Sequence, residues 1–283
     1  LDTPDRALDV SVHGDLAFVA DRYAGVRVID VSDPFSPREI GFWDPDINAA
    51  QVQFRNDRLY VGDQQNGLRV FTSQSRLRAV GLHHFPGLQS FAVDGSRAIV
   101  GDESGRLQIL DAPASGPGTI IGEYNLPAAP EALRVSDEHA YVAAGTRGIR
   151  ILDLSSPSSP REVGTYMPER DPSTASGTTL RYYPDPPSAW QITRSGDRLY
   201  ASFDDGIHVL DISSPSAPTP IGRFQASERA METTLRGDYL FAAFDDGLRV
   251  IDVSDPTRPT QVAMLDTPSY ARALVLDGQY LYL

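Results

Sequence analysis

The chain has 283 residues, no cysteine and a formal net charge of −13 at neutral pH. The lack of cysteine excludes disulfides, thiolate catalysis and cysteine-ligated zinc from this sequence. The acidic balance disfavours nucleic acid and anionic membranes as partners, because both reward a basic surface, and no apolar run is long enough to insert into a bilayer. One domain accounts for this length, and no shift in composition marks a second.

The first part of the chain predicts a four-stranded meander. Residues 7–12 alternate apolar and polar side chains, and residues 16–20 form an apolar run. Residues 25–30 and 38–42 complete the set, with glycine, aspartate, serine and proline in the turns between them. No segment of the chain has the period of an amphipathic helix. The pattern therefore indicates an all-β protein.

The third strand of this unit recurs along the whole chain. Its leading glycines are 42, 38, 43, 58 and 41 residues apart, so the repeat is about forty residues long with one expanded copy. A four-stranded repeat of this length predicts the blade of a β-propeller, with the six glycines at equivalent places. The six copies are GVRVID at 25–30, GLRVFT at 67–72, GRLQILD at 105–111, GIRILD at 148–153, GIHVLD at 206–211 and GLRVID at 247–252.

The two ends of the sequence predict part of one more unit. Residues 271–283 match the first two strands of a seventh repeat, and residues 1–4 resemble the end of a fourth strand at 264–268. We therefore expect six complete blades and half of a seventh, in a segment of a longer chain. A seven-bladed ring is the leading prediction, with six or eight blades left open. If residues outside the segment complete the seventh blade, residues 1–283 alone should expose strand edges and aggregate more than an extended chain.

In four of the six copies, the aspartate that ends the third strand begins a turn of the form Asp-X-Ser-[Asp/Ser]-Pro. Such carboxylates accept hydrogen bonds from backbone N–H groups about two residues further on, and proline fixes the backbone angle φ. We therefore interpret these four aspartates as turn residues rather than catalytic groups. They are Asp30, Asp153, Asp211 and Asp252.

The phrase Gly-[Leu/Val/Ile]-Arg-[Val/Ile]-[Ile/Leu]-Asp, followed by Val-Ser-Asp-Pro, resembles the LVIVD-repeat family of bacterial and archaeal surface proteins. The resemblance covers essentially the whole chain. No third strand ends in the Trp-Asp pair of WD40 repeats, and no second strand is followed by the Gly-Gly pair of kelch repeats. The resemblance implies a propeller fold and a secreted or cell-surface location, and it carries no general catalytic motif. The second copy departs from the pattern at 71–73 and the third at 112–117, which weakens the repeat but not the fold.

The loops that join second to third strands should share one rim of the propeller with the crossings between blades. This rim carries acidic turns, aromatic residues and arginines, and loops held by a rigid ring are where propeller function is expected. The longest crossing, the inserted loop 167–187, explains the 58-residue spacing. It is either a binding loop or a tolerated insertion. The candidates for partner contact are Tyr23, Trp43, Arg181, Tyr182, Tyr183 and Trp190.

Seven equivalent positions of the first strands include four large polar or acidic residues, where an apolar blade face would be expected. Together with residues 131 and 190, they should surround the entrance of the central channel. Two interpretations stay open, namely hydration of a water-filled channel and a ligand site. The channel-mouth candidates are Asp9, Gln51, Glu131, Gln191 and Glu232.

Neither a metal site nor a catalytic site is predicted. The five histidines do not gather with carboxylates on one rim, as a metal or general-base site would require. The doublets at 204–205 and 245–246 could bind Ca²⁺, but they lack the alternating oxygen ligands of a calcium loop, so a turn is the preferred interpretation. We therefore expect no cofactor.

Three functions follow from this sequence. We predict a single propeller domain over residues 1–283 that is not an enzyme. It would be a secreted or cell-surface module of a bacterium or archaeon that binds a protein or polysaccharide partner. The alternatives are a propeller-type lactonase or hydrolase with channel-mouth carboxylates, and a purely architectural domain of a larger surface protein.

Overall fold

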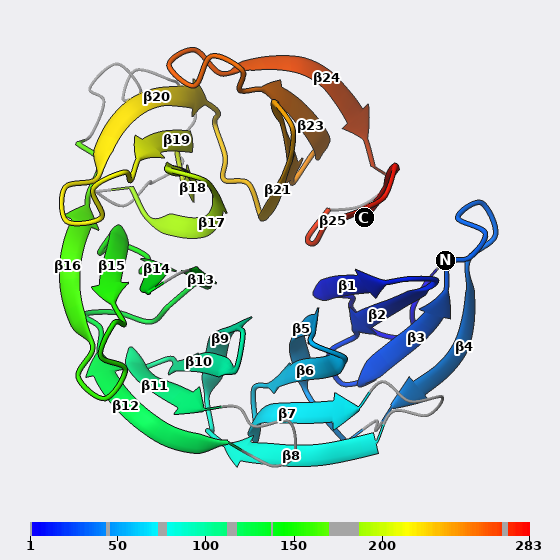
Figure 1. Ribbon diagram of the computed structural model, residues 1–283. Helices are drawn as coiled ribbons and strands as arrows, with labels where there is room; N and C mark the ends of the chain where they lie inside the picture. Colours follow the sequence, from blue (N-terminus) through cyan, green and yellow to red (C-terminus); the bar gives the residue numbers. More distant parts are fainter. Residues whose placement is uncertain are drawn as a thin grey trace.

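The computed structural model describes residues 2–43, 46–72, 78–111, 118–136, 138–169, 187–267 and 271–283. Every regular element in these residues is a β-strand, and none of them forms a helix that could cross a bilayer. The strands make six four-stranded sheets and one two-stranded sheet, arranged as a ring of blades (Figure 1). Within each sheet the strand order follows the chain, so each blade is the expected antiparallel meander.

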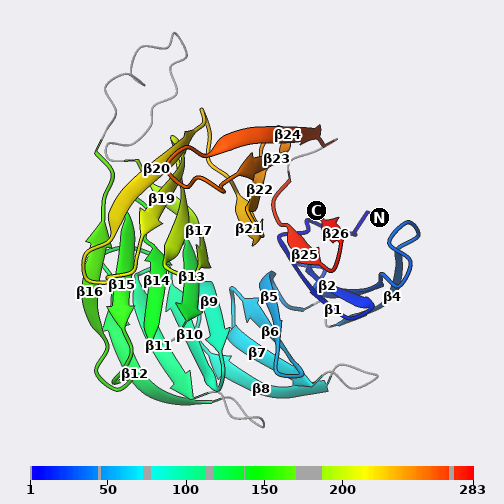
Figure 2. The same ribbon diagram turned by 45° about the horizontal axis from the view of Figure 1, so that its top comes forward.

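The six four-stranded blades are numbered in chain order, and in each the first strand lies nearest the ring's centre (Figures 1 and 2). The strands of blades 1 to 3 are β1 (Asp9–His13), β2 (Leu16–Ala20), β3 (Val26–Asp30) and β4 (Arg38–Trp43); β5 (Ala49–Arg55), β6 (Arg58–Asp63), β7 (Gly67–Thr72) and β8 (Arg78–His84); and β9 (Leu88–Asp94), β10 (Arg97–Asp102), β11 (Arg106–Asp111) and β12 (Thr119–Asn125). Those of blades 4 to 6 are β13 (Ala132–Ser136), β14 (His139–Ala143), β15 (Ile149–Asp153) and β16 (Arg161–Tyr166); β17 (Ala189–Ser195), β18 (Arg198–Phe203), β19 (Gly206–Asp211) and β20 (Thr219–Gln225); and β21 (Glu232–Arg236), β22 (Tyr239–Phe244), β23 (Gly247–Asp252) and β24 (Thr260–Asp266).

The two-stranded sheet, β25 (Val275–Asp277) and β26 (Tyr280–Tyr282), lies between blade 6 and blade 1 (Figure 1). On one side Leu274 and Leu281 pack into an apolar cluster with Leu248 of blade 6. On the other side Tyr282 packs with Val10 in the core of blade 1. Apolar contacts of this small sheet therefore connect the last complete blade with the first. The structure shows six complete blades and this partial sheet, and not seven complete blades.

The core consists of apolar clusters that each combine two neighbouring blades. Between blades 4 and 5, for example, Tyr141 and Ile151 pack with Phe203. Between blades 1 and 2, Phe71 is fully buried and the Trp43 ring meets it edge-on, with 3.9 Å between ring centroids. Because both faces of a blade are buried in this way, the hydrophobic effect holds the blades together and orients their loops toward the two rims.

The six repeat glycines lie at equivalent places, as the sequence predicts. All six have positive φ, a conformation that residues with a Cβ rarely adopt. At Gly206, for instance, an added Cβ would collide with the carbonyl of Phe224 in the fourth strand of the same blade. The φ values are 77° at Gly25, 114° at Gly67, 88° at Gly105, 70° at Gly148, 123° at Gly206 and 137° at Gly247.

A second set of glycines lies where one blade touches the proline turn of the next. In the fourth strand of blade 5, an added Cβ on Gly222 would collide with the carbonyl oxygen of Pro256, in the turn after the third strand of blade 6. Gly122 and Gly164 meet the turns of blades 4 and 5 in the same way. The equivalent residue of blade 6 is Ala263, which is exposed. Glycine is therefore required where a turn of the next blade packs on the strand.

This close approach predicts that Gly222→Ala destabilises the protein. The added methyl group would push against backbone rather than a movable side chain, so we expect a loss of about 1–3 kcal/mol in the free energy of unfolding, measured by urea denaturation. The matched control is Ala263→Gly at the equivalent place in blade 6, where the loss should not exceed about 1 kcal/mol. A Gly222→Ala variant as stable as the wild type would contradict this packing.

Candidate functional site

The loops between second and third strands do share one rim with the blade crossings. Arg22, in the first such loop, exchanges two backbone hydrogen bonds with Ala49 at the start of blade 2, at 3.1 and 2.9 Å. Gly145 of blade 4 accepts a hydrogen bond from the amide of Ala189 in blade 5 in a similar position. The binding candidates in these segments therefore belong to one surface, which we call the crossing rim.

Several carboxylates of the crossing rim are buried and not exposed to solvent. In blade 3, Asp102 accepts hydrogen bonds from the amides of Ser104 and Arg106 and from Nε of Arg106. In blade 2, Asp63 bonds to Nε of Arg69 at 3.1 Å. These aspartates hold the loop to the third strand. Their carboxylates are therefore buried, whereas the sequence analysis expected them to be exposed on the rim. The buried set is Asp21, Asp63, Asp102 and Asp204.

The aspartates that end the third strands have the turn role predicted for them. Asp153 accepts a hydrogen bond from the amide of Ser155 at 2.8 Å. It also forms an ion pair with Arg161, with 2.7 Å between Oδ2 and Nη2. Hydrogen bonds from Ser32, followed by those from Arg38, lower the pKa of Asp30 to about 2. Asp211 and Asp252 bond to the amide two residues on in the same way, and serine hydrogen bonds lower their pKa values too.

Three of the six partner-contact candidates lie among the described residues. Tyr23 is 53% exposed, with the guanidinium of Arg22 4.7 Å from its ring centroid. Trp43 is half-buried because it packs on the core between blades 1 and 2. Trp190 is half-buried as well. Arg181, Tyr182 and Tyr183, and most of the inserted loop, lie outside the described residues.

The indole of Trp190 is fixed from two sides. Its Nε1 donates a hydrogen bond of 2.7 Å to the buried carboxylate of Asp204, which also accepts one from the amide of Ser188. The guanidinium of Arg229 lies 3.6 Å from the centroid of its ring. Burial raises the pKa of Glu131, and the positive charge of this arginine, from the crossing into blade 6, opposes that rise. The stacked pair therefore lies next to the channel mouth.

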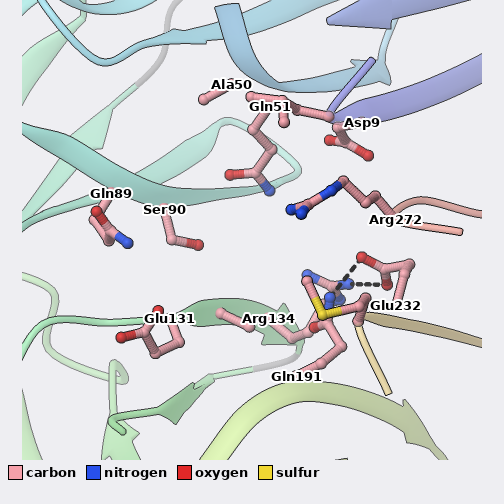
Figure 3. A pocket seen from close by; sticks show the side chains of 13 residues that line it. Asp9, Ala50, Gln51, Gln89, Ser90, Glu131, Arg134, Gln191, Glu232 and Arg272 are labelled. Atoms are coloured by element: carbon pink, nitrogen blue, oxygen red, sulfur yellow. Dashed lines mark hydrogen bonds and ion pairs between the residues drawn. The ribbon is translucent and has the colours of Figure 1, made fainter. Parts of the chain in front are cut away.

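The inner strands surround a cavity of about 200 Å³ (Figure 3). The first strands of the six complete blades, or the segments just before them, contribute to it, together with Arg272 from the segment before β25. All five channel-mouth candidates line it, so the structure brings them together. Its lining residues are Leu8, Asp9, Ala50, Gln51, Gln89, Ser90, Glu131, Ala132, Arg134, Gln191, Met231, Glu232 and Arg272.

Several polar side chains of the inner strands form hydrogen bonds between blades. The amide group of Gln51 accepts from the backbone N–H of Phe91 at 3.0 Å and donates to its carbonyl at 3.1 Å, as a neighbouring strand would. Asp9 accepts from the amide of Val52 at 2.9 Å. Each bond joins the first strand of one blade to the first strand of the next. These polar residues therefore have a structural role that neither sequence interpretation, hydration or ligand binding, had included.

Burial raises the pKa values of the cavity carboxylates. Asp9 has a pKa of about 7, mainly because it is withdrawn from water and secondarily because Glu232 is near. Burial also raises the pKa of Glu232, and Arg134, with Nη2 3.2 Å from Oε1, opposes the shift. Glu131 shifts upward for the same reason, opposed by a hydrogen bond from Gln89.

The sequence analysis did not include Arg134 or Arg272 among the cavity residues. Arg134 follows Ala132 by two positions in β13, so the period of a strand puts both side chains on the channel face. That signal was available in the sequence. Arg272 reaches into the cavity from the segment before β25 (Figure 3). Its direction depends on how the two-stranded sheet packs, which no local pattern reveals.

A buried polar chain lies between blades 4 and 5, away from the cavity lining. The hydroxyl of Tyr166 is 2.9 Å from Nδ1 of His208, and Nε2 of that ring is 3.0 Å from Asp205, which pairs with Arg223. Burial and Asp205 raise the pKa of Tyr166 to about 12. His208 stands where most copies of the repeat have arginine. Each group in the chain has a partner, so this is a satisfied core histidine.

Comparison with known proteins agrees with this geometry. The fold and the repeated blade define a propeller repeat protein. The model of the LVIVD repeat matches residues 5–44, 131–168, 187–226 and 229–267, which is more than half of the chain. The chain therefore belongs to the LVIVD-repeat family. No curated protein sequence matches it significantly.

Solved structures share the fold at low sequence identity. The WD40 repeats of RRP9 superpose with a TM-score of 0.75 at 11% identity, over 97% of this chain and 84% of that one. U3-55K gives 0.73 at 12% identity, over 97% and 86%. The computationally designed Ika8 protein gives 0.71 at 10% identity, over 99% and 80%. At these identities the likeness concerns the propeller fold alone.

The contacts of the aspartate doublets at 204–205 and 245–246 predict that Ca²⁺ does not stabilise the protein. Asp204 and Asp205 already bond to protein donors, and Arg249 pairs with Asp246 at 2.7 Å. Among the described residues no three His, Asp or Glu side chains form a group suited to a metal ion. We expect near-stoichiometric Ca²⁺ to leave the melting temperature unchanged in a thermal scan. A rise of several degrees would contradict this, because an ion that binds only the folded state stabilises it.

The pKa of Asp9 predicts that stability falls as pH rises from about 4 to about 7. Within this window the folded state retains a proton that the unfolded chain has released, so raising the pH favours unfolding. The raised pKa values of Glu131 and Glu232 act in the same direction. A shift of this size corresponds to a loss on the order of 4 kcal/mol at most.

The measurement is urea denaturation across this pH range, on the wild type and on Asp9→Asn. The variant should lose most of the pH dependence, because its side chain does not titrate. The control is Asp238→Asn, on the opposite rim, which should retain the wild-type slope. Equal slopes for the wild type and Asp9→Asn would show that Asp9 ionises normally.

Proposed function

We propose that this protein is a non-enzymatic binding or scaffold module that holds a protein or polysaccharide partner on its crossing rim. The repeat family and the propeller fold support a binding or scaffold role in general. The same family resemblance supports a secreted or cell-surface location in a bacterium or archaeon. We also propose a seven-bladed ring, since the two-stranded sheet occupies the place of a blade between blades 6 and 1.

The stacked pair of Trp190 and Arg229 is the observation that carries this proposal. Tryptophan and arginine are, with tyrosine, the residues enriched at binding hot spots. Here the indole is held by Asp204 and covered by the guanidinium, so little side-chain freedom remains to be lost on binding. Residue 190 also lies just after the 167–187 crossing, the longest one in the chain. A partner that contacts that crossing would therefore lie close to the pair.

The hydrolase alternative rests on the raised pKa of Asp9, since a carboxyl that titrates near 7 suits general acid–base chemistry. Against it, Asp9 and Glu232 are both engaged in hydrogen bonds that join or order the strands. A lactone hydrolysis assay separates the two. Turnover that disappears in Asp9→Asn would favour the enzyme, and the same slow background with both proteins would favour the binding module.

Replacement of Arg181, Tyr182 and Tyr183 by alanine should weaken partner binding without a large change in melting temperature. At the centre of an interface, each such residue contributes on the order of 2–4 kcal/mol. Rim charges, by contrast, mainly change association rates. Retention of the protein on immobilised cell-envelope polysaccharide and on surface-protein extract, scored as the bound fraction for each variant, measures the effect.

The matched control is Arg236→Ala with Tyr239→Ala, which removes an exposed arginine and a 46% exposed tyrosine from the opposite rim. It should bind as the wild type does. Normal binding by the triple variant, or equal losses for both variants, would refute recognition on the crossing rim. The purely architectural alternative predicts that none of these changes matters.

A further inference from the structure

The cavity at the channel mouth has an excess of negative charge. Three carboxylates and two guanidinium groups line it. Glu232 is the best compensated of the carboxylates, because it accepts hydrogen bonds from Arg134, Gln191 and the amide of Thr233. The net charge of −13 on the whole chain adds a potential that favours cations over anions at this site.

Asp9 is less well compensated than Glu232, because the positive charge of Arg134 only partly opposes the rise in the pKa of Asp9. It accepts hydrogen bonds from the amides of Val10 and Val52, at 2.8 and 2.9 Å, and it forms no ion pair with any residue that the structure describes. Its pKa of about 7 reflects burial without such a partner. A positively charged group in the cavity would therefore gain more from Asp9 than from the compensated Glu232.

Ser90 supplies an independent indication of a ligand. It is only 3% exposed, its hydroxyl points into the cavity, and it has no hydrogen-bond partner among the described residues (Figure 3). Buried hydroxyl groups are normally hydrogen-bonded. Gln89 and Glu131 lie on the same side of the cavity as Ser90, whereas Asp9 lies across it (Figure 3). The cavity therefore has the Asp9 carboxylate on one side, and a hydroxyl group beside a second carboxylate on the other.

The dimensions limit what can enter. A volume of about 200 Å³ is below the roughly 300–1,000 Å³ of pockets for drug-sized ligands. A metal ion fits the donors poorly, because Ca²⁺ takes six to eight oxygen ligands and the described side chains form no group of three or more carboxylates or histidines around one point. A small organic molecule with one charge suits the cavity better.

We propose that this cavity binds a small organic monocation that carries an ammonium group and a hydroxyl, with the ammonium against Asp9 and the hydroxyl toward Ser90 and Glu131. The ligand site borders the crossing rim, because Glu131 in its lining lies near Arg229, but Asp9 and Ser90 are not among the proposed partner contacts. Binding of the small cation can therefore be tested independently of the macromolecular partner.

Calorimetric titration with three probes of similar size tests the charge preference at about pH 8, where Asp9 is ionised. Ethanolamine is the cation, ethylene glycol the neutral analogue and glycolate the anion. We expect measurable binding of ethanolamine only, in the millimolar range. Binding should weaken at least threefold at about pH 5.5, because protonation of Asp9 removes the negative charge that would pair with the ammonium group.

Variants then assign the site. Asp9→Asn should weaken ethanolamine binding at least tenfold, because it removes the ion pair. Ser90→Ala should weaken it about threefold, because it removes a single hydrogen bond. Asp238→Asn, which removes a carboxylate from a cavity on the opposite rim, is the matched control and should bind as the wild type does. If Asp9→Asn fails to fold, the binding by Ser90→Ala and the pH dependence of wild-type binding still test the proposal.

Three results would overturn the proposal. The first is no heat of binding with ethanolamine at about 50 mM, and the second is equal binding of ethylene glycol. The third is tighter binding of Mg²⁺ or Ca²⁺ than of ethanolamine with loss in Asp9→Asn, which would make the cavity a metal site. Each result concerns the cavity alone, so none of them bears on recognition at the crossing rim.

Discussion

The free edge of each blade's innermost strand is the constraint on which the ring depends. That strand pairs with only one neighbour in its own sheet, so half of its backbone groups face the next blade in a narrow channel, where unpaired groups are costly. Side chains from the preceding blade supply the missing partners. Gln51 and Gln53 pair with Phe91 and Val93 of blade 3, and Thr193 donates to the carbonyl of Thr233 in blade 6. Polar residues in these strands thus join the blades.

The cavity and its chemistry follow from where this pattern changes. Blades 3 and 4 have Ser90 and Ala132 at the place of Gln51, and neither side chain bonds to the next blade among the residues described. The space that they leave forms part of the cavity. Asp9 bonds to the next blade through its carboxylate, which brings a charge into the channel. Within the described part of the chain, no arginine forms an ion pair with it. The hydrogen bonds that join the inner strands therefore also place a polar hollow at the centre of the ring.

Much of this could be predicted from the sequence, because propeller repeats are specified by local patterns. The leading glycines of the repeats, the turn aspartates and the polar ring of the first strands were all readable, since each depends on neighbours within a few residues. The burial of Asp63 or Asp204 was not, because it depends on how a loop folds back on an arginine or tryptophan. Nor was the contact between Gly222 and Pro256, which joins two blades, or the stacking of Arg229 on Trp190.

Native-state hydrogen exchange at the backbone amides of Phe91 and Val93 tests the role of the joining side chains most directly. The structure predicts that both amides are protected to a degree similar to Ile99 in the neighbouring strand β10, although they lie on the free edge of β9. In Gln51→Ala the amide of Phe91 should lose its protection, while that of Val93 keeps it through Gln53. Exchange at Phe91 as fast as in an exposed loop of the wild type, or unchanged in the variant, would contradict the account.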